Sequence, residues 1–165
     1  MANAMKARMS ELMAQEIEQN PNIILGKKTI GYALIVWVVS RLVFHAVDFI
    51  CVAQGFWELS TTNLVGLVTG IIFALSAYAG AKLFAILPMI GGFMLLYQGF
   101  TSGCFEVLFS NEYYTIVRVY AGAFILTALV QIIAFLFIAV NDKAKAYFDA
   151  FARVNTMVIN EGKSL

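Results

Sequence analysis

The chain has little charge. Only 13% of its 165 residues are charged and its formal net charge is +1, whereas roughly a quarter of a typical soluble domain is charged. A protein that binds nucleic acid carries a strongly basic face. The composition therefore argues against a soluble domain and excludes nucleic acid as a partner.

The sequence is also poor in the residues of common active sites. It has one histidine, too few for a bis-histidine haem site, and its two cysteines, Cys51 and Cys104, do not form a CxxC pair. Ser40, His45 and Asp48 are the residue types of a nucleophilic triad. On a helix, however, Ser40 lies about 140° around the axis from His45, too far for the required hydrogen bond. We therefore expect no catalytic residue, no metal and no cofactor.

Hydrophobic residues make up 61% of the chain, and the mean hydropathy is +0.82. A helix that crosses a bilayer needs about 20 apolar residues. Pro88 and the Gly91-Gly92 pair interrupt one apolar segment, where we expect a bend. The sequence predicts an all-α, multi-pass membrane protein with four transmembrane helices, at Gly31–Ala53, Asn63–Ala81, Leu83–Phe100 and Val119–Val140.

The positions of the lysines predict the orientation. Cytoplasmic loops carry an excess of lysine and arginine. The intervening loops, Gln54–Thr62 and Thr101–Arg118, are acidic, with Arg118 as their one basic residue. We therefore expect both termini in the cytoplasm and the protein in the cell's cytoplasmic (inner) membrane. The lysines that support this are Lys27, Lys28, Lys82, Lys143 and Lys145.

Both tails have apolar residues at helical spacing. We predict amphipathic helices in residues 1–26 and 141–165, on either side of a transmembrane domain at 27–140. Such helices lie on the membrane surface, bind a partner or rest on the protein's own cytoplasmic face, and the sequence leaves all three open. The apolar positions are Met5, Met9, Leu12, Met13 and Ile17, and then Tyr147, Phe148, Phe151, Val154 and Val158.

One stripe of the first span carries its charged residues. Arg41, His45 and Asp48 fall within a wedge of roughly 60° on a helix. An arginine or aspartate at a span's centre costs about 2.5–3.5 kcal/mol on insertion, so this face must turn away from lipid. Gln98 and Gln131 on later spans are candidate partners. The stripe is a structural network between helices, a proton or ion path, or an anion site at Arg41.

Small residues on the second span suggest close helix packing. Gly66 and Gly70 form a GxxxG pair, and Ser76 and Gly80 follow at the same spacing. Small residues let helix backbones approach in lipid. The pattern fits both internal packing and a homo-oligomer interface.

The two cysteines fall on the outer side in the predicted topology. Cys51 ends the first span and Cys104 lies in the second outer loop. An oxidising compartment would allow a disulfide between them, and buried free thiols are the alternative.

These features predict a noncatalytic membrane protein that acts as a subunit of a membrane complex or as a homo-oligomer. Its partners would be the lipid bilayer and either copies of itself or other membrane subunits. One alternative is a small proton-coupled transporter or ion channel that uses the polar stripe as its path. A second alternative is a lipid-modifying membrane enzyme.

Overall fold

Helices form all the regular secondary structure of residues 2–58 and 61–163, the part of the chain that this computed structural model describes. Met1, residues 59–60 between α2 and α3, and residues 164–165 lie outside the described residues. The helices are α1 (Ala2–Gln19), α2 (Asn22–Ala53), α3 (Thr61–Tyr78), α4 (Leu83–Thr101), α5 (Cys104–Phe109), α6 (Thr115–Val140) and α7 (Asp142–Lys163).

Three helices, α2, α4 and α6, are long and apolar enough to cross a membrane. They correspond to three of the four predicted spans. The apolar part of α3, Val65–Tyr78, is shorter than these three helices. The helix α2 is longer than the predicted span Gly31–Ala53. It begins at Asn22, directly after Pro21, and includes Lys27 and Lys28.

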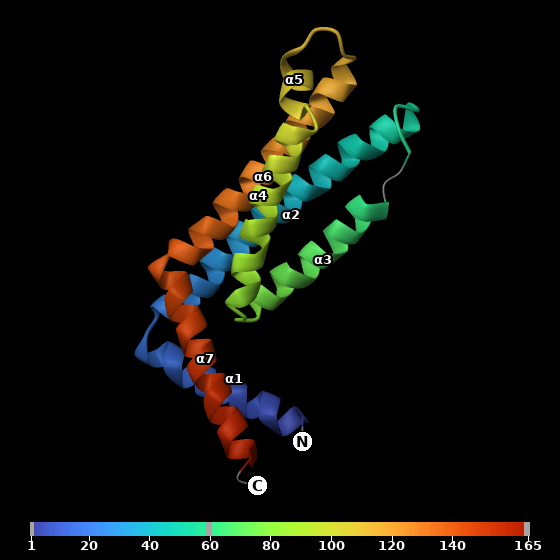
Figure 1. Ribbon diagram of the computed structural model, residues 1–165. Coiled ribbons are helices and arrows are strands. Elements are labelled where there is room, and N and C mark those ends of the chain that lie inside the picture. Colours follow the sequence, from blue (N-terminus) through green and yellow to red (C-terminus); the bar gives the residue numbers. More distant parts are fainter. Residues whose placement is uncertain (1, 59–60, 164–165) are drawn as a thin grey trace.

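Four helices run side by side in alternating directions (Figure 1). α2 packs against α6, and α6 against α4. α3 returns along the side of α2 and α4 and joins α4 through a short turn around Lys82. Both ends of the chain lie at the same end of this bundle, where α1 and α7 cross (Figure 1).

The turn between α3 and α4 contains a glycine that no other residue could replace without strain. Gly80 has a φ of +105°, and a Cβ built there would overlap the ring of Phe151 on α7. α7 also meets the first turns of α2, where a Cβ at Gly26 would overlap the backbone carbonyl of Lys143. The C-terminal helix is therefore seated on the bundle by two backbone approaches that only glycine allows.

The tail helices pack on each other and on the end of the bundle. Ile23, Tyr147 and Phe148 belong to a hydrophobic core that continues into the spans, with Met13 of α1 packed against it. Two ion pairs join α1 to α7: Arg8 Nε lies 3.0 Å from Glu161, and Arg153 Nη2 lies 2.6 Å from Glu16. Of the three arrangements open for the tails, the structure shows the one on the chain's own surface.

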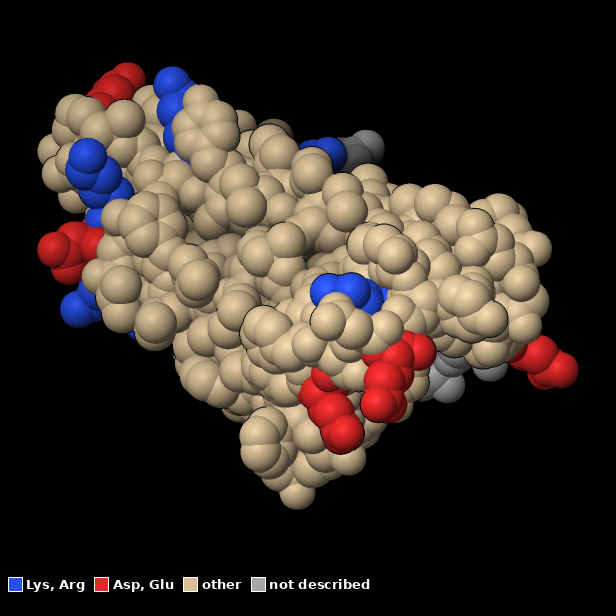
Figure 2. Space-filling view, turned by 90° about the horizontal axis from the view of Figure 1, so that it is seen from above, with Lys and Arg blue, Asp and Glu red and all other residues tan. Residues whose placement is uncertain are grey.

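Charged side chains are confined to small parts of the surface. From above, most of the visible surface has no charged residue, and acidic and basic groups gather in a few separate places (Figure 2). The helices α3, α4 and α6 carry exposed apolar side chains, including Val65, Ile72, Phe93 and Ile133. Such a surface is suited to lipid rather than to water.

Candidate intramembrane polar site

The polar stripe of α2 is turned into the bundle. Arg41 and Asp48 are 8% and 3% exposed, and His45 is half-buried. Asp48 lies about 10 Å along the axis from Arg41. The chain therefore covers both charged side chains with its own helices.

Asp48 borders a cavity at the α5 end of the bundle, which we call the loop cavity. Its volume is about 410 Å³. Trp57, in the segment after α2, donates from its indole Nε1 to Asp48 Oδ1 at 3.0 Å. Gln98, which was predicted as a partner of the stripe, lines the same cavity. The lining residues are Asp48, Trp57, Gln98, Ser102, Cys104, Tyr120 and Phe124.

Aromatic rings hold the residues around Asp48 in place. The rings of Trp57 and Tyr120 meet edge to face with centroids 4.6 Å apart. Phe44 packs against Tyr120, Phe124 and the imidazole of His45, at centroid distances of 5.3, 5.7 and 5.3 Å. Such contacts restrict ring orientation, so the polar groups of the loop cavity are held by a cluster of packed aromatic rings.

Two buried polar atoms of the stripe have no hydrogen-bond partner among the described residues, Arg41 Nε and His45 Nε2. Within this part of the chain, no carboxylate forms an ion pair with Arg41. An unpaired buried polar group costs about 1–3 kcal/mol, and more when it is charged. Gly66 on α3 makes room for the guanidinium, since a Cβ there would lie 3.4 Å from Arg41 Nη2.

Gln131 pairs with Trp37 rather than with the charged stripe. Trp37 Nε1 donates to Gln131 Oε1 at 3.0 Å, and Gln131 Nε2 donates to the backbone oxygen of Pro88 at 2.6 Å. This Trp37–Gln131–Pro88 network joins α2, α6 and α4. Sequence reasoning missed Trp37, although it lies one turn before Arg41 on the same face of the helix.

The glycines of α3 face α2. A Cβ at Gly70 would lie 2.7 Å from the Trp37 ring, so Gly66 and Gly70 both serve contacts within the chain. Ser76 instead donates to the Ile72 carbonyl of its own helix, at 2.8 Å. Gly80 lies beyond the end of α3.

Both cysteines are free. Cys51 is buried, with its Sγ 4.0 Å from the Ile116 carbonyl. Cys104 lines the loop cavity, with its Sγ 3.3 Å from Ser102 Oγ. Within residues 2–58 and 61–163, no group of three or more His, Cys, Asp or Glu side chains is placed to bind a metal ion.

No family model matches the sequence, and no curated protein or solved structure is significantly similar to it.

Proposed function

We propose that the protein is a small proton-conducting transporter whose path uses Arg41, His45 and Asp48. The observation that carries the proposal is a pair of buried atoms without a hydrogen-bond partner among the described residues, Arg41 Nε and His45 Nε2, on the same face of α2 as Asp48, which borders a polar cavity. Ionisable residues inside a membrane mark ion and proton paths. Histidine changes charge between pH 5 and 8, and so suits proton transfer near neutrality.

The path requires α3 to be the fourth span. α2 and α4 run in the same direction through the bundle, and α3 leads from the end of one to the start of the other (Figure 1). Its 18 residues extend about 27 Å, close to the roughly 30 Å of a bilayer core. A return crossing between two parallel spans has to traverse the same depth, which supports four spans.

The basic residues support an orientation with both termini in the cytoplasm of the cell and the bundle in its cytoplasmic membrane. Lys27, Lys28 and Lys82 belong to the end of the bundle where the termini lie. The opposite end carries Glu58 and Glu106. Under the positive-inside rule, the loop cavity then opens to the outer side.

The other half of the bundle is closed to a solute that enters from the loop cavity. The Trp37–Gln131–Pro88 network crosses three helices just beyond Arg41, and Phe135 and Ile138 are fully buried beyond it. Transport therefore requires this network to open. Pro88 makes α4 a suitable moving part, because its missing amide leaves one intrahelical hydrogen bond unmade.

Proteoliposomes that enclose a pH-sensitive dye test the proposal. Wild-type protein should dissipate an imposed pH gradient faster than empty liposomes, and Asp48→Asn should abolish this flux. Ser76→Ala is the matched control, because the Ser76 hydroxyl donates to the Ile72 carbonyl of its own helix, and it should leave the flux unchanged. Equal flux in wild-type and empty liposomes, or in wild type and Asp48→Asn, would refute the proposal.

A second candidate function is a noncatalytic subunit or homo-oligomer. It is favoured by an apolar groove of about 360 Å³ between α2 and α3, bordered by exposed Ile35, Val39 and Leu75. A helix of a neighbouring subunit would fill such a groove. Light scattering in mild detergent should then give a defined oligomer that Val39→Trp dissociates, and a monodisperse monomer would exclude this function.

A further inference from the structure

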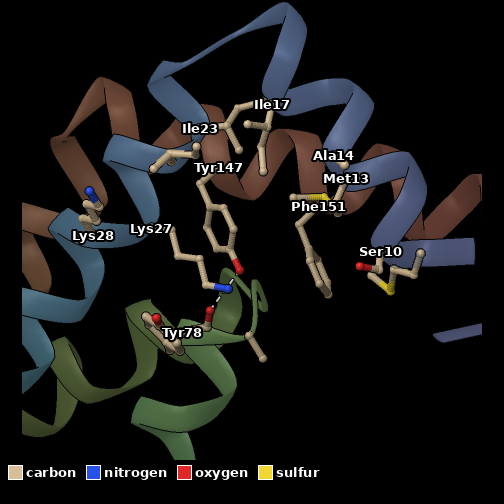
Figure 3. A pocket seen from close by; sticks show the side chains of 13 residues that line it. Ser10, Met13, Ala14, Ile17, Ile23, Lys27, Lys28, Tyr78, Tyr147 and Phe151 are labelled. Carbon is tan, nitrogen blue, oxygen red and sulfur yellow. Dashed lines mark hydrogen bonds between the residues drawn. The ribbon is translucent and has the colours of Figure 1, made fainter. Parts of the chain in front are cut away.

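A second cavity lies where the tail helices meet the bundle, on the other side of the Trp37–Gln131–Pro88 network from the loop cavity. We call it the tail cavity. Its volume is about 640 Å³, within the range of about 300–1,000 Å³ typical of small-molecule sites. Helices α1, α2 and α7 form its walls, together with Tyr78 and Ala79 at the end of α3 (Figure 3).

One wall of the tail cavity is apolar although it lies on a helix outside the spans. Met9, Met13 and Ile17 follow one another at four-residue spacing on α1, and all three are only half-buried. Ile23 and Phe151 continue this surface on α2 and α7 (Figure 3). The methionines are flexible, and so suit an apolar ligand of variable shape. This wall would accept an acyl chain.

Two neighbouring lysines of α2, Lys27 and Lys28, line the opposite side. Lys27 Nζ lies 5.1 Å from the centre of the Tyr78 ring and 5.9 Å from that of Tyr147, distances at which a ring face attracts an ammonium group. Among the described residues, no carboxylate forms an ion pair with Lys27. Its charge is therefore held in place by two rings and not neutralised.

The tyrosines themselves are fixed. Tyr147 donates from its hydroxyl to the backbone oxygen of Tyr78 at 2.9 Å (Figure 3). Tyr147 is 4% exposed, and burial raises the pKa of its phenol, so the hydroxyl stays a donor. Lys28 also lines the cavity, but its side chain points away from Lys27 and the tyrosines (Figure 3). The chain thus presents one ordered positive charge beside one apolar slot.

We propose that the tail cavity binds one anionic phospholipid, with its phosphate at Lys27 and part of an acyl chain along Met9, Met13 and Ile17. A phospholipid is favoured over a soluble anion because Lys27 lies on α2 just before its apolar run, at the depth of lipid headgroups. Basic pockets between transmembrane helices on the cytoplasmic side bind such headgroups. The site is separate from the proposed proton path.

Native mass spectrometry of the full chain in uncharged detergent tests the site. The protein is incubated with phosphatidylglycerol or with phosphatidylcholine, and retained lipid is counted. The wild type should keep one phosphatidylglycerol per chain and prefer it to phosphatidylcholine by about fivefold or more, the effect of one lysine near a membrane surface. Equal retention of the two lipids would overturn the proposal.

Two variants separate the charge from the slot. Lys27→Gln should remove the preference for the anionic lipid, whereas Lys82→Gln, an exposed lysine outside the cavity lining, should keep it. Ala14→Trp fills the cavity from an exposed position on α1 and should reduce retention of both lipids. Identical behaviour of the two lysine variants, or undiminished retention in a folded Ala14→Trp protein, would overturn the assignment.

A competition experiment distinguishes a phospholipid from a free fatty acid. Oleate added in equimolar amount should not displace phosphatidylglycerol, and complete displacement would overturn the phospholipid assignment. Proton flux of Lys27→Gln should equal that of the wild type. Failure of the flux experiment would therefore leave the lipid site standing, and failure of the lipid experiment would leave the transport proposal standing.

Discussion

The two halves of the polar face of α2 differ in how far their polar groups are hydrogen-bonded. Toward the tail helices, Trp37, Gln131 and the Pro88 carbonyl satisfy one another in a tight network. Toward the loop cavity, Arg41 Nε and His45 Nε2 are buried without such partners among the described residues. A satisfied buried network stabilises a fold, whereas unsatisfied groups lower its stability and are often retained for function. The first half therefore has a structural role and the second half is the candidate site.

The largest effect should come from breaking the satisfied half. Gln131→Leu leaves the buried Trp37 indole N–H unpaired, at a cost of about 1–3 kcal/mol, and also removes the hydrogen bond to the Pro88 carbonyl, at about 0.5–1.5 kcal/mol. The free energy of unfolding in detergent should fall accordingly. Gln98→Leu, in the loop cavity, is the control and should change stability much less. Equal losses in the two variants would remove the distinction between the halves.

A smaller loss of stability is expected from crowding the satisfied half at Gly70. Gly70→Ala places a Cβ 2.7 Å from a Trp37 ring atom, and overpacking of this kind costs about 1–3 kcal/mol. Gly66→Ala meets only the Arg41 guanidinium at 3.4 Å. It should be neutral or slightly stabilising, because alanine favours helix over glycine by about 1 kcal/mol. Thermal unfolding of the two variants, compared side by side, checks this order.

In the unsatisfied half, removing the charge should not destabilise the fold. Arg41→Leu takes away a buried cation that has no ion pair within the described residues, and replacement of buried charge by apolar groups is often neutral or stabilising. We expect an unchanged or higher unfolding temperature together with loss of proton flux. A large drop in that temperature would show that Arg41 has a structural role, as Gln131 does.

The smallest effect concerns polar pairs outside the spans. Arg153 holds the pKa of the Glu16 carboxyl below its usual range, and Arg8 does the same for Glu161, mainly through hydrogen bonds. Stability from a lowered carboxyl pKa is present above the unfolded-state value, about 4.3, and is lost as the pH falls through the folded-state value. The protection factor of the α1 amides, which corrects for the pH dependence of intrinsic exchange, should therefore fall modestly between pH 5 and about pH 3.

Arg153→Gln removes one of the two pairs and serves as the reference for this pH effect. Its α1 should exchange slightly faster than that of the wild type at pH 7, and should respond less to acid. Exposed ion pairs contribute little, so α1 should stay docked through Met13 and Ile17. Complete release of α1 in the variant would contradict this expectation.

Sequence reasoning found the membrane class and three spans because uncharged apolar runs of about 20 residues are rare outside membrane-crossing helices. The helix α2 extends beyond the predicted span to Asn22, because charge at Lys27 and Lys28 ends an apolar run without ending a helix. Gln98, which was predicted as a partner of the stripe, lines one cavity with Asp48.

The partner of Gln131 was not predictable in the same way. Periodicity shows which residues share a face of a helix, but not which other helix packs on that face. A tryptophan in an apolar run is also counted as a hydrophobic residue, so Trp37 was not considered as a hydrogen-bond donor. The tail cavity was missed because it is made by four segments distant in sequence. Only packing shows that Met9, Lys27, Tyr78 and Tyr147 border the same space.

The continuity of α2 has a mechanical consequence. Its 32 residues from Asn22 to Ala53 form one unbroken rod of about 48 Å, and residues at both cavities are fixed to it. If α2 rotates about its axis as a rigid body, Lys27 and Asp48 therefore rotate by the same angle. A spectroscopic probe attached beside Lys27 would therefore report rotation of α2 at Asp48, near the opposite end of the helix, without disturbing the residues there.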